Sequence, residues 1–114
     1  MNGKDEKRDI MRATKENILE YLKEIKSELK NDGIISLALF GSFSRCEQTV
    51  YSDIDIAIKK ESNYLEKRTA YTYLNEISKI KEMIKTKFHR NSDIFDLDSD
   101  SPMKENIKKD LLYV

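Results

Sequence analysis

Apolar residues in the first third of the chain recur at helical spacing and then give way to an unbroken apolar run. Between residues 11 and 29 they stand three, four or seven places apart, which predicts an amphipathic helix. We expect that helix to end near Gly33, because glycine readily takes the left-handed conformation that closes helices. Residues 34–40, IISLALF, carry no charge and predict a buried strand that stops at Gly41. The apolar helix positions are Met11, Ile18, Leu22, Ile25 and Leu29.

A second strand is predicted at residues 51–59, where apolar and acidic side chains alternate. Successive side chains of a strand point to opposite faces, so this alternation separates one fully apolar face from one that carries two carboxylates. The apolar face holds Ile54, Ile56 and Ile58, and the other holds Asp53, Asp55 and Ala57.

The rest of the pattern predicts a long helix, a short strand and a last helix. After a polar turn at residues 60–63, a helix is expected from about Tyr64, with an apolar stripe along it. Residues 92–97, SDIFDL, predict a third strand interrupted by acids. Ser101-Pro102 is typical of a helix start, with serine as the cap and proline in the first turn. The expected stripe consists of Ala70, Leu74, Ile77, Ile80, Ile84 and Phe88.

Length and composition favour one domain over residues 1–114, with residues 1–8 polar and expected to be flexible. The 21 basic and 21 acidic residues cancel, so the total charge gives no reason to expect direct nucleic-acid binding or affinity for a membrane. Cys46 is the only cysteine, which excludes an intrachain disulfide. No apolar run suits a signal peptide or a membrane span, so we expect a cytoplasmic protein.

Charge is nevertheless uneven towards the end of the chain. Residues 79–90 hold five basic side chains against Glu82 alone, and four aspartates follow within residues 93–100. Two interpretations stay open, a solvated helix face beside an acidic turn or a charge-complementary docking surface.

Gly41-Ser42 stands at the end of the first strand, before a turn that residues 42–47 can make helical. Glycine lets the backbone approach a polyphosphate closely, and the serine hydroxyl and free amides of such a turn bind phosphate oxygens. The pair alone also fits an ordinary turn. It is no P-loop, because the Gly-Lys-Ser/Thr ending of that motif is absent.

Asp53 and Asp55 are predicted to point from one face of a strand into the same small space, where their charges would repel. A divalent cation removes that cost, and Mg²⁺ binds one or two carboxylates together with substrate phosphates. Two such ions can activate an attacking hydroxyl and stabilise an in-line displacement at phosphorus. The alternative is a surface pair of acids at a strand end.

Taken together, GSFSR at residues 41–45 and SDIDIAI at residues 52–58 resemble the signature of the DNA polymerase β-like nucleotidyltransferases, in particular the minimal (MNT) type. The resemblance spans nearly the whole chain. It implies an α+β nucleotidyltransferase fold, in which a small mixed sheet of about three strands is flanked by helices. It also implies a nucleotidyltransferase activity of the EC 2.7.7 type.

The same resemblance implies site residues. Asp53, Asp55 and Asp93 would be the catalytic carboxylates and the ligands of two Mg²⁺ ions, with Asp96 as the rival third ligand if the strand register shifts. ATP would be bound through four further residues, Gly41, Ser42, Arg45 and Ser52.

One position departs from the pattern, because the family usually has glycine after the arginine of its GSxxR string and this chain has Cys46. If that position requires a positive φ, cysteine would strain the loop and could lower activity. If it is only closely packed, cysteine is tolerated.

Small MNT proteins typically pair with HEPN-domain ribonuclease toxins, so the resemblance implies an antitoxin that transfers AMP from ATP to a tyrosine of its toxin. Two alternatives stay open. The protein could neutralise its toxin by binding alone, or it could modify a small molecule in the manner of an aminoglycoside nucleotidyltransferase. The short chain, which has no room for a separate substrate domain, argues against the second.

Overall fold

A computed structural model describes residues 10–114, so the predicted flexible segment 1–8 lies outside the described residues. Within them, no helix is both long and apolar enough to cross a membrane. The elements follow one another as α2 (Lys15–Asn31), β1 (Ile34–Phe40), β2 (Ile54–Lys60), α3 (Tyr64–Lys67), α4 (Ala70–Phe88), β3 (Ser92–Asp96), α5 (Lys104–Lys108) and β4 (Leu112–Tyr113).

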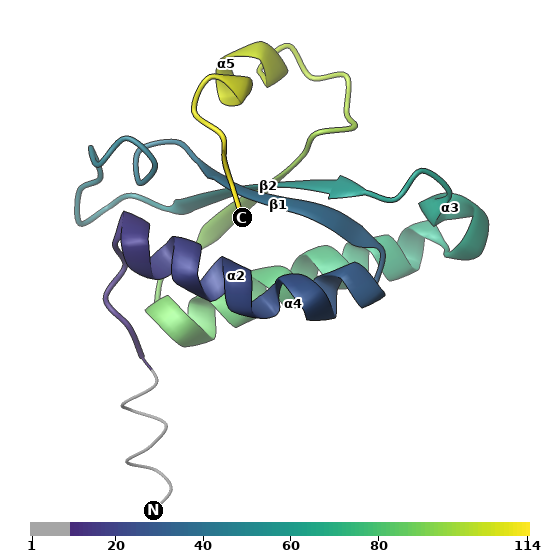
Figure 1. The fold of residues 1–114 in the computed structure, drawn as a ribbon, viewed down its shortest axis with the longest axis horizontal. Coiled ribbons are helices and arrows are strands. Elements are labelled where there is room, and N and C mark those ends of the chain that lie inside the picture. The colour runs from purple at the N-terminus through teal and green to yellow at the C-terminus, as the bar shows by residue number, and fades with distance from the viewer. Residues whose placement is uncertain (1–9) are drawn as a thin grey trace, which may run out of the picture.

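The four strands form one mixed sheet in the order β3-β2-β1-β4 (Figure 1). β1 is antiparallel to β2 and β4, whereas β2 and β3 are parallel. This confirms the expected α+β fold, but the sheet has a fourth strand where about three were expected. Leu112 and Tyr113 pair with Leu39 and Ala38 of β1. Two residues are too few to show the alternation by which strands are found in a sequence.

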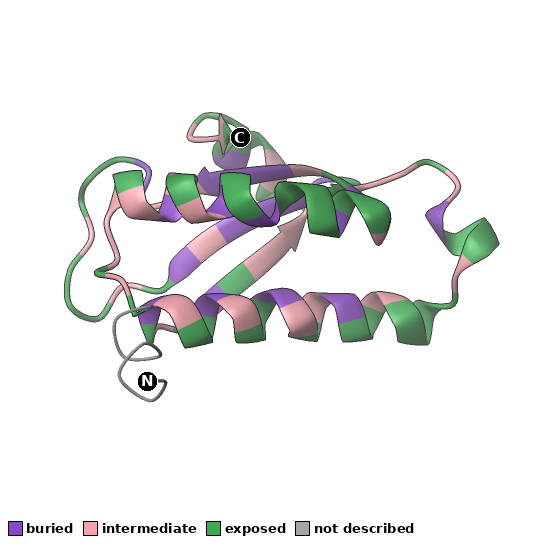
Figure 2. Cartoon of the chain, turned by 60° about the horizontal axis from the view of Figure 1, so that its bottom comes forward, coloured by how far each residue is buried: buried purple, intermediate pink, exposed green. Residues whose placement is uncertain are grey.

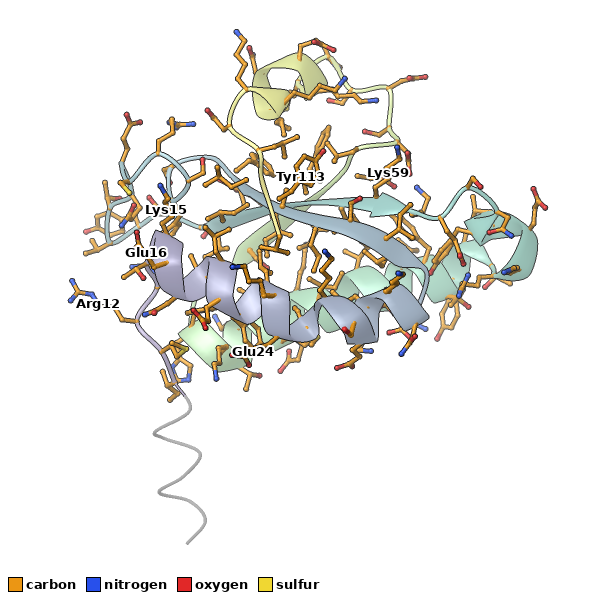
Figure 3. All side chains as sticks on the ribbon, in the orientation of Figure 1. Arg12, Lys15, Glu16, Glu24, Lys59 and Tyr113 are labelled. Atoms are coloured by element: carbon orange, nitrogen blue, oxygen red, sulfur yellow. The ribbon has the colours of Figure 1, made fainter. Side chains whose placement is uncertain are left out.

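Helices α2 and α4 lie side by side on one face of the sheet, and α5 with its connecting segments lies on the other (Figure 1). Each long helix buries a stripe towards the sheet and exposes the opposite side (Figure 2). The second face carries a smaller apolar cluster around Ala38, Ala57 and Leu97. Lys59 and Tyr113 lie on this α5 side, whereas Glu24 projects from α2 on the opposite side (Figure 3).

Two helix boundaries follow predictable local chemistry. Helix α2 begins after Thr14, whose side chain accepts a hydrogen bond from the Asn17 amide at 3.0 Å, and Met11 therefore precedes the helix instead of starting it. At the other end, Gly33 has φ +96°, the left-handed conformation expected of it.

The predicted continuous helix from Tyr64 is wrong, because the chain leaves helical geometry at Arg68, which is extended (φ −135°, ψ 162°). Arg68 pairs with Glu61 and lies over the Tyr64 ring. Thr69 then caps a new helix, α4, by accepting a hydrogen bond from the Thr72 amide. The signal for this break was the threonine, which is a common cap.

The expected apolar stripe of α4 is confirmed only in its second half. Ile80, Ile84 and Phe88 are buried, but Ala70 and Leu74 are exposed. The buried first-half position is Glu76 instead, and burial, followed by the nearby Asp32 carboxylate, raises its pKa to about 7. A glutamate cannot be predicted as a core residue from periodicity.

Two other boundaries also differ from the sequence predictions. β2 begins at Ile54, three residues later than expected, so Asp53 precedes the strand. α5 begins at Lys104, although Ser101 does organise its start, with its hydroxyl accepting a hydrogen bond from the Met103 amide at 3.2 Å.

Candidate active site

Three of the predicted site residues, Gly41, Asp55 and Asp93, lie together at one end of the sheet, and the two aspartates project from the face away from α2 and α4. Asp55 of β2 lies between two neighbours in register, Phe40 of β1 and Asp93 of β3. Because paired residues point to the same face, Asp55 and Asp93 project on the same side of the sheet. Gly41 directly follows Phe40, so the turn stands on the β1 side of Asp55 and Asp93 on the β3 side.

Gly41 is in close contact with Asp55. It has φ +79°, and a Cβ atom at this position would clash with Asp55 Oδ2. Both the left-handed backbone and the lack of space require glycine here. The turn therefore helps to position one of the acidic side chains.

Residues 42–46 form a hydrogen-bonded turn within the segment 42–47 that the sequence indicated, although it is too short to count as a helix. The amides of Ser44 and Arg45 donate to the Gly41 carbonyl. The amides of Ser42 and Phe43, by contrast, donate to no carbonyl within residues 10–114, and the Ser42 hydroxyl makes no hydrogen bond there. Free amides that begin a helical turn suit a phosphate.

Cys46 ends this turn in the left-handed conformation, with φ +58°. The Glu47 amide donates to the Ser42 carbonyl at 2.9 Å and the Cys46 amide to the Phe43 carbonyl at 3.3 Å. These two bonds form the Schellman closure, whose left-handed position is usually glycine. The position thus requires a positive φ, and the turn keeps its hydrogen bonds with cysteine in place.

We predict that Cys46→Gly raises the free energy of unfolding by about 0.5–1 kcal/mol, because glycine adopts this conformation without the Cβ strain. The gain is partly offset by the greater freedom of glycine in the unfolded chain. Urea denaturation checks this, with Cys46→Ala as the control that keeps the strain. Equal stability of the two variants would contradict the prediction.

The electrostatics of the site centre on Asp55. Burial, then the charges of Asp93 and Asp53, raise the pKa of Asp55 to about 6, and the Arg45 charge opposes that rise. Asp53 and Asp93 are exposed. The charges of Asp53 and Asp93 thus lie close enough to disfavour the ionisation of Asp55, the situation that a bound cation relieves.

Ser52 and Asp53 belong to a loop that is fixed from the end of α4. The Ser52 hydroxyl accepts a hydrogen bond from the Thr49 amide at 2.8 Å, and its carbonyl accepts one from Arg90 at 2.7 Å. The Arg90 guanidinium also lies over the Phe43 ring, 5.4 Å from its centroid. Sequence reasoning missed Arg90, and the only signal was its place in a basic stretch.

Arg45 is exposed and does not stand free towards a substrate. It donates to Glu47 at 2.9 Å and to Asp110, which lies shortly before β4. These two acceptors raise the pKa of its guanidinium. The turn is therefore tied to the C-terminal segment, a contact between residues 65 positions apart that no local pattern predicts.

Asp96, the rival third carboxylate, lies on the other face of β3 from Asp93. Burial alone would raise its pKa, but hydrogen bonds from Lys60 and Tyr73 hold that pKa below its usual value. The Tyr73 hydroxyl donates to Asp96 at 2.6 Å. The structure thus brings Asp93 to Asp55 and places Asp96 against α4.

Within residues 10–114, no three His, Cys, Asp or Glu side chains are grouped closely enough to hold a metal ion unaided. Mg²⁺ seldom uses such a cage, because it retains waters and takes one or two carboxylates together with substrate phosphates. The paired carboxylates of Asp55 and Asp93, with Asp53 beside them and the phosphate-suited turn across from them, fit this mode of binding.

A glycine-serine turn beside carboxylates on neighbouring strands of an α+β sheet is the arrangement that the sequence resemblance implies for a nucleotidyltransferase of the polymerase β type. A family model described as "Polymerase beta, Nucleotidyltransferase" matches residues 23–113, so the chain belongs to this family and is a nucleotidyltransferase.

Curated relatives from Methanocaldococcus jannaschii agree with this assignment. "Putative protein adenylyltransferase MJ0126" is 34% identical over 104 residues, and "Putative protein adenylyltransferase MJ1379" is 35% identical over 107 residues. Each match covers 89% of this chain and 98% of the relative.

A solved structure shares the fold. The chain described as "Structure of putative minimal nucleotidyltransferase" superposes with a TM-score of 0.67 at 20% identity, covering 88% of this chain and 95% of that one.

Proposed function

We propose that this protein transfers AMP from ATP, with Mg²⁺, to a tyrosine hydroxyl of a partner protein. The observation that carries the proposal is the meeting of the Gly41-Ser42 turn with Asp55 and Asp93 in one corner of the sheet. The names of the M. jannaschii relatives support a protein as the acceptor. The sequence resemblance supports a HEPN-domain toxin as that protein, which would make this chain an antitoxin.

In the proposed reaction the amides of Ser42 and Phe43 donate to the β and γ phosphates of ATP. Asp53, Asp55 and Asp93 would hold Mg²⁺, which when bound would supply positive charge against the charge that develops on the phosphates. Asp93 accepts the proton of the attacking hydroxyl. A bond forms between the acceptor oxygen and the α-phosphorus, the bond from that phosphorus to the bridging oxygen breaks, and pyrophosphate leaves.

Label transfer tests this proposal. The protein is incubated with Mg²⁺, ATP labelled at the α-phosphate and a HEPN-domain partner, with the Asp53→Ala/Asp55→Ala variant as the control. We expect label on a partner tyrosine with the native protein only. Absence of label, with both proteins folded, would overturn the proposal. If the variant still neutralises the toxin, neutralisation occurs by binding alone.

The Gly41 contact leads to a separate prediction for the transfer rate. Gly41→Ala is expected to lower AMP transfer about a hundredfold, because the new Cβ displaces the Asp55 carboxylate by roughly an ångström. It should also cost about 1–2 kcal/mol of stability through backbone strain. Initial rates, normalised to folded protein, check the first effect.

Gly33→Ala is the matched control, since Gly33 also has a positive φ (+96°) and little space for a Cβ, but against Tyr64 and Arg68. It should lose stability and keep its transfer rate. A rate that falls equally in both variants would show that the Asp55 contact is not the cause.

A further inference from the structure

A cleft of about 540 Å³ lies between α4 and the start of β3 and opens on the proposed metal-binding carboxylates. Its α4 wall is a stripe of four residues spaced three and four apart, and all four are exposed. Asp53 and Asp93 also line it. The α4 stripe consists of Ser78, Lys81, Glu82 and Lys85.

The two lysines of this wall have no acidic partner among the described residues. Neither Lys81 nor Lys85 forms an ion pair within residues 10–114, and Lys85 donates only to the neutral Asn91 side chain at 3.1 Å. Lys79 on the same helix differs, because it bridges Glu28 and Asp32 at 2.8 and 2.7 Å. The hydroxyl of Ser92, a residue 7% exposed in the cleft lining, also lacks a hydrogen-bond partner among the described residues.

A loop held by several hydrogen bonds extends the same surface. A second hollow of about 520 Å³ shares Asp53 and Lys85 with the cleft and is lined by Val50 and Tyr51. These two side chains are 77% and 89% exposed, although the backbone beneath them is fixed by Arg90 and by the Thr49 and Ser52 hydroxyls. An ordered loop that exposes an aromatic ring suits contact with another molecule.

The strand order leaves the β3 edge of the site open to the second substrate, the acceptor. The phosphate-suited turn follows β1, and β3 is the edge strand on the opposite side of β2. In-line displacement requires the acceptor to attack from the side opposite to the leaving pyrophosphate. With the phosphates at the turn, the acceptor hydroxyl approaches along the β3 edge, where the cleft and the loop lie.

We propose that the acceptor docks here as an acidic protein segment, its carboxylates on Lys81 and Lys85 and an apolar side chain against Val50 and Tyr51. This inference rests on the proposed function, whose acceptor it specifies. Glu82 is the one acid of the α4 wall, and it limits how many carboxylates the segment brings to that position. The lysines select the acceptor and take no part in the chemistry.

The experiment compares two synthetic peptides of equal length, each with one tyrosine, flanked by glutamates in one and by lysines in the other. Binding is followed by fluorescence anisotropy and AMP transfer by label from ATP. We expect the native protein to favour the glutamate peptide about tenfold in both assays, an effect that weakens in high salt. Lys81→Glu/Lys85→Glu should reverse the preference and leave the KM for ATP within about twofold.

Lys23→Glu/Lys30→Glu is the control, because it makes the same change of charge on exposed positions of α2. It should keep the preference of the native protein. The inference is overturned if neither peptide binds preferentially, or if both double variants behave alike. Preferential binding without any AMP transfer would overturn the proposed function and still support this surface as a docking site for acidic segments.

Discussion

Replacing Asp55 by asparagine is expected to abolish AMP transfer and to make the protein more stable at neutral pH. The loss should reach about a thousandfold, since a ligand of the cation that offsets phosphate charge supplies several kcal/mol to the transition state. The gain in stability follows from the charge that asparagine removes. Asp55 is half-buried beside two other carboxylates, and its pKa lies at about 6.

The direction of the pH effect can be worked out from that pKa. A carboxyl whose pKa is raised on folding binds its proton more tightly in the folded state. The free energy of unfolding of the protein therefore falls as the pH rises from about 4 to about 6. Above that range the loss of stability is constant, at roughly 2 kcal/mol after allowance for solvent screening of this half-exposed side chain. Asp55→Asn should therefore exceed the native protein in stability above about pH 6 and equal it below about pH 4.

Urea denaturation of both proteins in EDTA at these two pH values measures the effect. Added Mg²⁺ should stabilise the native protein and leave Asp55→Asn nearly unchanged, because the variant has lost a ligand. A variant that is less stable at neutral pH would mean that Asp55 is not opposed by its neighbours.

The sequence predicted what depends on local patterns. Alternation in residues 54–58 correctly separated the buried isoleucines from Asp55, and Gly33 correctly marked the end of α2. The turn at Gly41 was also predictable, because glycine and serine after an apolar run are typical of one. These features concern neighbours in the chain, whose geometry the residue types themselves restrict.

Contacts between distant segments were not predictable in the same way. Gly41 touches Asp55, and Arg45 reaches Asp110, only because the strands pair in one register. The two-residue strand β4 has no pattern of its own and forms because β1 offers an open edge. The burial of Glu76 was likewise not predictable, because a charged residue is expected at the surface of a helix.

The identity of the third carboxylate could not be predicted from the sequence. Asp93 and Asp96 lie three residues apart, so they face opposite sides of β3, and the sequence alone left both possible. Strands β2 and β3 pair from Ile54 and Ser92 onwards, and this register places Asp93 beside Asp55. The consequence can be tested by comparing two conservative variants.

Asp93→Asn is expected to lose AMP transfer by about a hundredfold or more and to keep or slightly raise its stability, because Asp93 is exposed, forms no ion pair within residues 10–114 and opposes the charge of Asp55. Asp96→Asn should behave in the opposite way. It weakens charged hydrogen bonds from Lys60 and Tyr73, at a cost of about 1–3 kcal/mol, and should keep transfer within about threefold.

The pair of variants serves as its own control, since each removes one carboxylate charge from the same strand. Transfer rates at saturating ATP and denaturation curves give the two readouts independently. If Asp96→Asn loses transfer and Asp93→Asn retains it, Asp96 is the third carboxylate. The face of β3 that the site uses would then be the one against α4, which requires a register different from that of the parallel pair Asp55 and Asp93.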